Sequence, residues 1–218
     1  MITILVQLKK TEKILGYEYY HVFHGYISEL LGNDRYGHEA GDYVYSNICG
    51  GRCTTDGFSF PGNNPYFYIR TDSEKVWQNF LKNIKNKKNI MEGFIVEGFS
   101  IVDVKLHNSV FETDASTPIL VSKKYNLVAN LSREELIDTE NYMVESVRRK
   151  ANELGISIDN NLSIKVLLQR KSRNINYRGI INRGRNLRLR INCDDKTKEF
   201  ILVHGIGRST GCGFGFLI

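Results

Sequence analysis

The chain has 218 residues, of which 41% are hydrophobic and 25% charged, and its formal net charge is +6. That length can hold one large domain or two of about 100 residues each. The apolar runs, such as residues 2–6 and 200–203, are far shorter than the roughly 20 residues that a membrane-spanning helix needs, which argues against such helices. The first residues alternate like a strand and lack the pattern of a signal peptide, so we expect a cytoplasmic protein.

The first half of the chain reads as alternating strands and helices. We expect strands at residues 2–8, 43–48, 66–70 and 94–106, and helices at 19–31 and from about 73 to 84. Gly32 would stop the first helix, and Val76, Phe80 and Ile84 recur every four residues along the second. The resulting order β-α-β-β-α-β is that of a ferredoxin-like domain.

The second half repeats this order approximately. Ser132 and Glu135 form a capping box that would start a helix ending near residue 154. Strands are expected at residues 119–121, 127–131, 162–168, 177–181, 187–191 and 200–204. We therefore predict an α+β fold of two tandem ferredoxin-like (RRM-like) domains, residues 1–114 and 115–218, with a boundary in the segment 114–118.

Positive charge is concentrated in one segment. Between residues 163 and 193 there is no acidic residue but nine basic ones: Lys165, Arg170, Lys171, Arg173, Arg178, Arg183, Arg185, Arg188 and Arg190. The other 21 of the 30 Lys and Arg face all 24 Asp and Glu, so the rest of the chain is net negative. Because apolar residues alternate with the basic ones, we expect paired strands with one basic face and a polyanionic partner, most simply a nucleic acid.

The cysteines do not indicate a metal site. Cys49, Cys53, Cys193 and Cys212 show neither a Cys-x-x-Cys pair nor the spacing of a structural zinc site. We expect reduced thiols in or near strands, no metal and no cofactor.

The last fifteen residues carry the most specific motif. Five glycines fall within eleven residues, at Gly205, Gly207, Gly211, Gly213 and Gly215, directly after a predicted strand. Such a loop can adopt positive φ and allow close approach of another chain. Its successive N–H groups can also cradle phosphates.

Gly205-x-Gly207, five residues, and Gly213-x-Gly215 resemble the signature loop of the repeat-associated (RAMP) proteins. Within them the chain is similar to the CRISPR pre-crRNA endoribonucleases, the sixth Cas family. The arginine-rich stretch 178–190 stands where that family has a basic hairpin, and His38 follows the first helix within the sequence Gly37-His38-Glu39. Thr117-Pro118 resembles the start of the family's second domain. The resemblance spans nearly the whole chain.

The resemblance implies a metal-independent reaction. Members of the family cleave CRISPR repeat RNA through attack of its own 2′-hydroxyl, which leaves a 2′,3′-cyclic phosphate and a 5′-hydroxyl. His38 matches the family's catalytic histidine, and histidine suits proton transfer because its ordinary pKa lies near working pH. Of the other histidines, His107 and His204 stand in predicted strands, where we expect them either to pack or to lie at the surface. We expect His21 and His24 to lie on the polar face of the first helix.

The helper groups of the family are only partly matched. The family often adds a tyrosine on the first helix and a lysine after the histidine. In this chain the tyrosine corresponds in position to Ser28, and no lysine occurs between residues 13 and 75. His24, one turn before Ser28, or Tyr36 could replace the tyrosine. Arg52, or an arginine of the basic hairpin, could supply the cation for the phosphate.

We expect RNA contacts from the hairpin and the loop, namely Lys171, Arg173, Arg178, Arg183, Arg185, Arg188, Arg190, Gly205, Gly207, Arg208, Ser209, Gly213 and Gly215. The expected partner is CRISPR repeat RNA or crRNA, while other Cas proteins of an effector complex and a second copy of the chain stay open. Two alternatives also stay open. One is a non-cleaving RAMP subunit that holds guide RNA, and the other is a generic RNA-binding protein that stacks bases on Tyr66, Phe67 or Tyr68, although strand alternation turns at least one of these inward.

Overall fold

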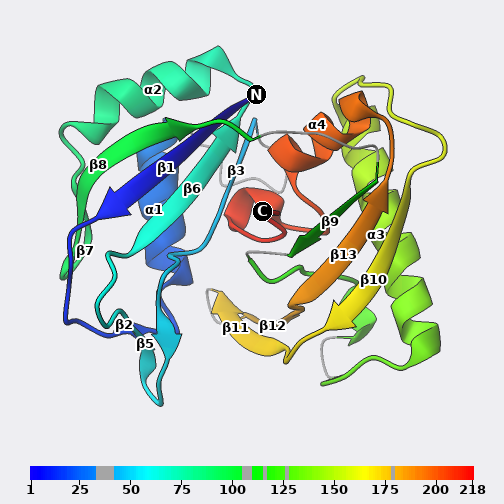
Figure 1. The fold of residues 1–218 in the computed structure, drawn as a ribbon, viewed down its shortest axis with the longest axis horizontal. Coiled ribbons are helices and arrows are strands. Elements are labelled where there is room, and N and C mark those ends of the chain that lie inside the picture. The colour runs from blue at the N-terminus through cyan, green and yellow to red at the C-terminus, as the bar shows by residue number, and fades with distance from the viewer. Residues whose placement is uncertain (33–41, 105–109, 115–116, 126–127, 178–179) are drawn as a thin grey trace.

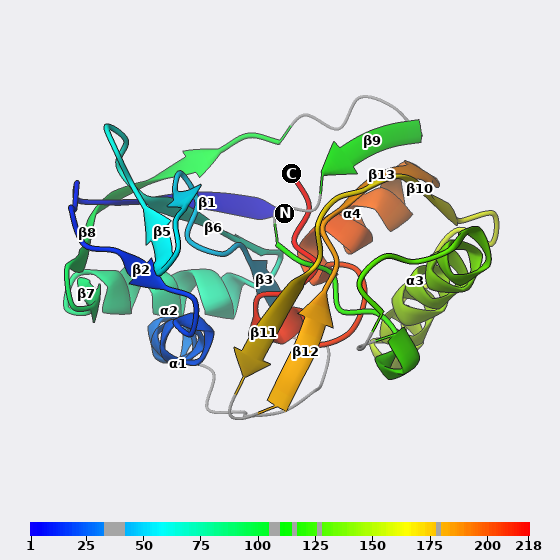
Figure 2. The ribbon, with the colours of Figure 1, turned by 90° about the horizontal axis from the view of Figure 1, so that it is seen from below.

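A computed structural model describes residues 1–32, 42–104, 110–114, 117–125, 128–177 and 180–218 of the chain. The protein consists of two halves that lie side by side, each an antiparallel sheet with two helices against one face (Figure 1). Seen from below, the helices of both halves lie on the same side of their sheets, so the other two faces look in a common direction (Figure 2).

The first sheet has the order β3-β6-β1-β8-β7 and is built from β1 (Ile2–Leu8), β3 (Tyr43–Tyr45), β6 (Tyr66–Thr71), β7 (Asn89–Met91) and β8 (Phe94–Val102). Alternate residues of its strands, among them Ile4, Val6 and Phe67, are buried. Their core also contains residues of α1 (Tyr20–Leu31) and α2 (Glu74–Ile84). The predicted strand 94–106 ends earlier than expected, and residues 105 and 106 lie outside the described residues.

The end of α1 and the start of α2 are formed as the sequence predicts. Gly32 follows α1 with φ +68°, the left-handed conformation that glycine adopts without strain. The Ser73 side chain accepts a hydrogen bond from the backbone N–H of Val76 at the start of α2. Phe80 and Ile84 of the predicted apolar stripe are buried, as is Val76.

Strand β7 was not predicted, and neither were three short strands outside the first sheet. They are β2 (Leu15–Gly16), β4 (Arg52–Cys53) and β5 (Gly57–Ser59), which pair as a small sheet of order β2-β5-β4 beside α1. Pairs of two or three residues are too short to leave a periodic signal in the sequence.

The second sheet has the order β10-β13-β9, from β9 (Val110–Asp114), β10 (Ser163–Gln169) and β13 (Leu187–Asn192). Helix α3 (Arg133–Glu153) starts with the predicted capping box, since Ser132 and Glu135 satisfy each other's backbone N–H. Strand β9 was not predicted, and it pairs with β13 although it precedes the expected boundary at residue 114. Along β13 the exposed Arg188 and Arg190 alternate with buried neighbours, which confirms the predicted basic face of this strand.

The basic segment also forms a separate hairpin. Strands β11 (Arg173–Tyr177) and β12 (Ile180–Gly184) pair with each other and lie between the two halves (Figure 1). The predicted strand 177–181 therefore overlaps the end of one strand and the start of the next, around residues 178 and 179, which lie outside the described residues.

The prediction of a strand at residues 200–204 is wrong. These residues belong to α4 (Asp195–His204), whose first turn is capped by the Asp194 side chain at 2.7 Å from the N–H of Thr197. Phe200, Ile201 and the two residues that follow are all buried, so this part of the helix shows no amphipathic pattern. A short apolar run of this kind does not distinguish a strand from a helix.

Two other predicted strands are also absent. Ile119 and Leu120 form only isolated bridges, to Arg185 and Arg208, and residues 128–131 are not in a strand. The segment instead contains a 3-10 turn, η1 (Lys123–Tyr125). Among the described residues no helix is both long enough and apolar enough to cross a membrane.

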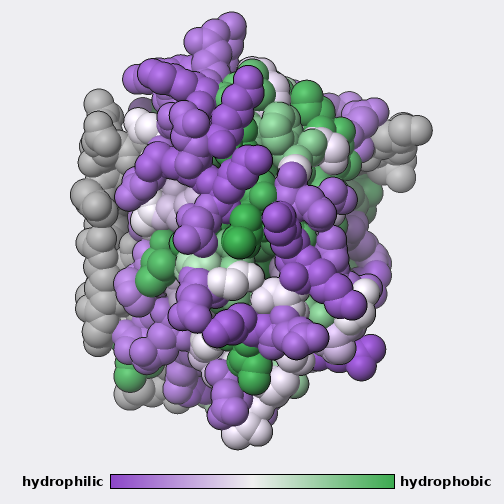
Figure 3. Space-filling view, turned by 90° about the vertical axis from the view of Figure 1, so that its left-hand side faces the viewer, coloured by the Kyte–Doolittle hydropathy of each residue, from purple (hydrophilic) through white to green (hydrophobic). Residues whose placement is uncertain are grey.

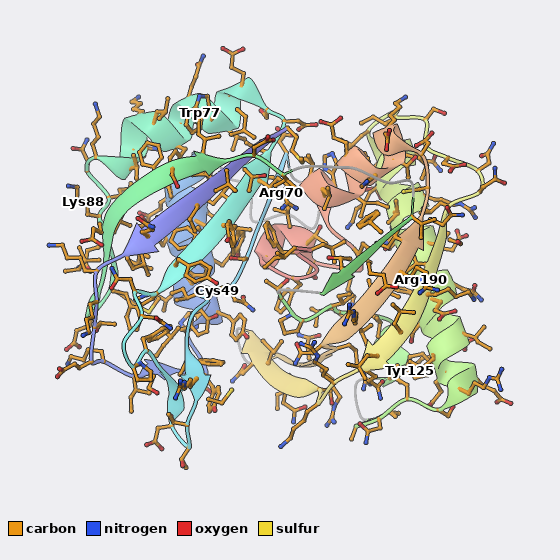
Figure 4. The ribbon with its side chains drawn as sticks, viewed as in Figure 1. Cys49, Arg70, Trp77, Lys88, Tyr125 and Arg190 are labelled. Atoms are coloured by element: carbon orange, nitrogen blue, oxygen red, sulfur yellow. The ribbon has the colours of Figure 1, made fainter. Side chains whose placement is uncertain are left out.

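The two halves meet at Arg70 of β6, which is 3% exposed and lies between the sheets (Figure 4). Its Nη1 donates to the carbonyl oxygens of Leu202 in α4 and Leu217 near the C-terminus, at 3.0 and 3.2 Å. Its Nε donates to Thr3 Oγ1, and its guanidinium stacks 4.6 Å from the centre of the Phe216 ring. One residue thus joins β1, β6, α4 and the C-terminal segment.

Figure 3 shows the side of the first half that faces away from the second half, where Figure 1 places α2, β7 and β8. Hydrophilic residues predominate on this face, and apolar side chains reach the surface between them. Phe99 and Ile101 of β8 are 40% and 62% exposed, although Phe99 also contacts the Trp77 ring of α2.

Candidate functional site

The glycine-rich loop follows α4 and returns between the two halves. Gly205, Gly207, Gly213 and Gly215 all have φ between +68° and +86°, the left-handed region that favours glycine. The backbone conformation at these four positions therefore favours glycine.

Their surroundings give a second reason. A Cβ at Gly213 would lie 2.5 Å from the Tyr45 ring, and one at Gly207 would lie 2.6 Å from the Leu120 carbonyl oxygen. A Cβ at Gly215 would collide with the Ile206 carbonyl oxygen. All four glycines are buried, so the segments that approach them closely are parts of the protein itself. This packing explains the motif without RNA, and RNA contact at these positions stays a prediction that their burial does not favour.

The outer part of the loop is more open. Ser209, Gly211 and Arg208 are partly exposed, and Ser209 has φ +57°. The Arg208 side chain donates to the Val121 carbonyl oxygen at 2.9 Å and to Asn182 Oδ1 of β12 at 2.8 Å. Arg208 thus joins the loop to the basic hairpin.

A buried lysine holds the start of the loop. Lys150 of α3 is 6% exposed, and its Nζ donates to the carbonyl oxygens of His204 and Gly205, at 3.2 and 3.1 Å. These are carbonyls at the C-terminal end of α4, where a cation is favourable. Burial lowers the pKa of Lys150 to about 7.

The first-helix histidine predicted as a helper is part of the packing. His24 is 7% exposed, and its Nδ1 lies 2.9 Å from Tyr45 Oη in a hydrogen bond. Because the Tyr45 ring also contacts Gly213, His24 supports the glycine-rich loop from beneath. The structure does not place His24 on the exposed polar face that the helical periodicity predicts.

The remaining catalytic candidates are dispersed or not described. Ser28 is half-buried in α1, and Arg52 is exposed in β4. His38 and Tyr36 lie outside the described residues. Of the two histidines that were expected in strands, His204 lies in α4, buried against the Phe200 ring with ring centres 4.4 Å apart, and His107 lies outside the described residues.

RNA contact of Arg185 stays a prediction that its burial does not favour. Its side chain is 0% exposed, and its two terminal nitrogens donate to the carbonyl oxygens of Tyr125, Val128 and Ala129, at 2.7 to 2.9 Å. Arg185 therefore holds the backbone at Tyr125, Val128 and Ala129. A basic residue next to a strand carries no sequence signal that separates this role from a surface role.

The other predicted basic contacts are distributed over two places. Arg188 and Arg190 lie on the exposed face of β13, and both pair with Glu112 of β9 (Figure 4 labels Arg190). Lys171 is exposed ahead of β11, and Arg183 of β12 reaches Ser172 Oγ at 3.4 Å. Arg173 lies in β11, and Arg178 lies outside the described residues.

Residues far apart in the sequence form a groove of about 800 Å³ between the halves. The first half lines it with three tyrosines near the start of α1, with residues 47–51, and with Cys53 and Phe58. The second half lines it with Pro118, Asn186 and residues 170–172 and 174–175, which lead into the basic hairpin. Tyr17 contributes a 40% exposed ring, and Arg170 and Lys171 are exposed cations. Cys49, labelled in Figure 4, lies on the first-half side.

The groove adjoins the glycine-rich loop. Tyr20, which lines the groove, stacks on Phe214 of the loop, with ring centres 6.0 Å apart. Residues 46–49, which form one wall, are anchored to β6 by the bonds Ser46 N to Tyr68 O and Cys49 N to Tyr66 O, at 2.9 and 2.7 Å. Sequence reasoning missed this groove because its residues come together only through the packing of the two halves.

The aromatic run on β6 is arranged as strand alternation predicts. Phe67 is fully buried, whereas Tyr66 and Tyr68 are partly buried on the other face of the sheet. Tyr68 stacks on Phe216 at 6.1 Å, so its ring already has an aromatic partner within the protein.

No protein-family model and no curated protein matches the sequence. Solved structures do match over the whole chain. A RAMP protein that binds different RNA substrates superposes with a TM-score of 0.83 at 18% identity, covering 100% of this chain and 98% of that one. A Cas6-related protein from Pyrococcus furiosus gives 0.79 at 16% identity, covering 100% and 97%. The CRISPR RNA processing endoribonuclease Cas6b gives 0.58 at 14%, covering 100% and 99%.

At such identities the likeness concerns the fold. The likeness covers each chain almost completely. The matched structures include a RAMP protein and a CRISPR RNA processing endoribonuclease, the two groups that the glycine pattern resembles. Over its full length the chain is a structural match to the Cas6 and RAMP CRISPR endoribonucleases.

Proposed function

We propose that this chain binds CRISPR repeat RNA and cleaves pre-crRNA as a metal-independent endoribonuclease. The observation that carries the proposal is the groove between the halves, where tyrosines and amides of the first half face Arg170 and Lys171 of the second. The exposed Tyr17 ring and the two cations in one groove suit a single-stranded nucleic acid, since a base can stack on the ring and phosphates can pair with the cations.

We further propose that the two sheets are two tandem ferredoxin-like domains. In the first sheet, β8, β1, β6 and β3 lie in the order fourth, first, third and second within β-α-β-β-α-β. In the second, β10, β13 and β9 are followed along the chain by α4 and by a C-terminal segment. Hydrogen bonds tie that segment to Thr117 and Pro118. A boundary near residue 114 would then need to move before β9, which pairs in the second sheet.

The proposed reaction needs no group from outside the protein and the RNA. The 2′-oxygen attacks the adjacent phosphorus as its proton passes to a base, and the bond to the 5′-oxygen breaks as that oxygen gains a proton. Products are a 2′,3′-cyclic phosphate and a 5′-hydroxyl. His38 is our candidate for one of the two proton transfers.

A repeat RNA with a single 2′-deoxy sugar just upstream of the cut tests this reaction. We expect the substituted RNA to bind like the unmodified one and to remain intact, because the attacking oxygen is missing. Cleavage of unmodified RNA should persist in EDTA. Cleavage of the deoxy substrate, or loss of activity in EDTA, would contradict the proposed mechanism.

A second candidate function is a RAMP subunit that holds RNA without cutting it. It is favoured by the position of His24, which is buried and hydrogen-bonded to Tyr45 rather than open to a substrate. Wild-type protein that binds repeat RNA tightly but leaves it uncut under single-turnover conditions would support this candidate.

A further inference from the structure

Asn47 occupies an unusual place on the wall of the groove. It is 9% exposed, and among the described residues its side-chain oxygen Oδ1 is buried and accepts no hydrogen bond. A buried acceptor without a donor lowers stability, so such groups are rare and point to a missing partner. Thr139 and Arg185 also have an unpaired buried atom, but neither lines the groove.

The backbone around Asn47 is held firmly. Its own carbonyl oxygen accepts from Ser46 Oγ at 2.8 Å and from Cys49 Sγ at 3.2 Å. Ser46 in turn exchanges hydrogen bonds with the backbone of Tyr68. The amide is therefore presented from an anchored segment, as a specific recognition group requires.

The groups around the same groove supply what a nucleotide needs besides base recognition. Tyr17 offers a ring that is 40% exposed, and its hydroxyl donates to the Thr54 carbonyl oxygen at 2.6 Å, which fixes the ring. Lys171 is exposed on the opposite wall, and its carbonyl oxygen accepts from Asn186 Nδ2 at 2.9 Å.

From this arrangement we infer that the groove contains a base-selective subsite in which the Asn47 amide recognises an adenine of the bound RNA. An amide offers one acceptor and one donor side by side. The adenine N6 amino group donates between two acceptors, N7 and N1, so the amide can pair with adenine from either edge. Tyr17 stacks the base and Lys171 binds a phosphate. This inference rests on the proposed RNA-binding function and adds a preference for one base.

Binding of labelled oligoadenylate, oligocytidylate and oligouridylate of about ten nucleotides, measured by fluorescence anisotropy, tests the subsite. We expect the wild-type protein to bind oligoadenylate about five- to a hundredfold more tightly, the range of one good bidentate pair. Asn47→Leu, similar in size, should abolish that preference and leave the melting temperature unchanged or higher, because it removes an unpaired buried oxygen. Asn47→Ala is a second variant with the same expected loss of preference.

Two matched controls separate base recognition from general binding. Tyr17→Ala should weaken all three oligonucleotides alike, because every base stacks on a ring. Lys171→Ala should also weaken all three and should reduce the slope of log K against log salt by about 0.7. Neither should change the ratio between oligonucleotides.

The outcomes distinguish this inference from the proposed function. Equal binding of the three oligonucleotides by wild type, or an adenine preference that survives Asn47→Leu, overturns the adenine subsite and leaves RNA binding intact. Failure of wild type to bind any of them overturns both.

Discussion

Among the described residues, three buried cations donate hydrogen bonds to backbone carbonyl oxygens. Lys150, Arg70 and Arg185 are 6%, 3% and 0% exposed, and among the described residues none has a carboxylate within ion-pair distance. Burial disfavours a charge unless hydrogen bonds replace its hydration. Each of the three donates to at least two carbonyl oxygens, so charge-assisted bonds offset part of that cost.

Lys150 makes stability depend on pH. Its pKa is about 7 in the folded protein and 10.5 ordinarily, because burial penalises its charge. Between these values the unfolded chain binds the proton and the folded protein has released it, so the free energy of unfolding rises with pH. Urea unfolding from pH 7 to 9 should show this rise in wild type, beyond that of Lys150→Met. Parallel pH profiles of the two proteins would contradict it.

His38 is the residue on which cleavage depends most in our proposal. His38→Ala should slow single-turnover cleavage of repeat RNA by about a hundred- to ten-thousandfold, the usual contribution of a proton-transfer group. Affinity should stay within about threefold, because the proposed binding groove is lined by other residues.

His21→Ala is the matched control for His38, since His21 is exposed and its Nδ1 lies 3.0 Å from the Glu18 carbonyl oxygen. It should cleave normally. If His38→Ala cleaves at the wild-type rate and His21→Ala does not, the assignment to His38 is wrong.

At the scale of elements, the glycine-rich loop is a packed structural element. It is held by Lys150 at its start, by Tyr45 beneath Gly213, and by the Thr117 side chain, whose Oγ1 accepts from the N–H of Phe216 at 2.8 Å. The hydrogen bond from Ile206 N to Gly215 O, at 3.1 Å, closes the loop on itself. The motif is thus needed to fold the junction between the halves.

The loop provides a matched pair of substitutions. Gly215 has φ +68° and no room for a Cβ, whereas Gly211 has nothing within 4 Å of that position. Gly215→Ala should therefore lower the free energy of unfolding by about 2 kcal/mol or more. Gly211→Ala should change it by less than about 1 kcal/mol. Urea denaturation of both variants checks this, and equal stabilities would contradict a structural role of the loop.

At the scale of the whole molecule, the relative placement of the two halves depends on Arg70. Removing its side chain leaves the Leu202 and Leu217 carbonyl oxygens without their donor inside the interface. We expect Arg70→Met to lower the free energy of unfolding by about 3 kcal/mol, because hydrogen bonds to a charged group contribute more than neutral ones.

The control is Arg190→Met, at an arginine that is exposed on β13 and pairs with Glu112 at the surface. That change should cost less than about 1 kcal/mol. Chemical denaturation of both variants tests the comparison. If the two variants are equally stable, Arg70 does not hold the halves together.

The sequence by itself determined the α+β class, most helices and the strands with clear alternation. The capping box at Ser132 and the stripe of Val76 and Phe80 are local signals, and local signals survive without knowledge of the fold. The glycine pattern likewise indicated the fold, because positive φ favours glycine whatever surrounds the position.

Tertiary structure decided what local patterns leave open. Residues 200–204 form the end of a helix that the sequence did not predict, because a short apolar run that is entirely buried has no period that distinguishes a helix from a strand. Arg185 turned inward and Arg190 outward although both belong to the same basic segment, since the carbonyl oxygens of Tyr125, Val128 and Ala129 lie beside only one of them. The groove with Asn47 arises from two distant segments, and no sequence period relates residues that only the packing of two sheets brings together.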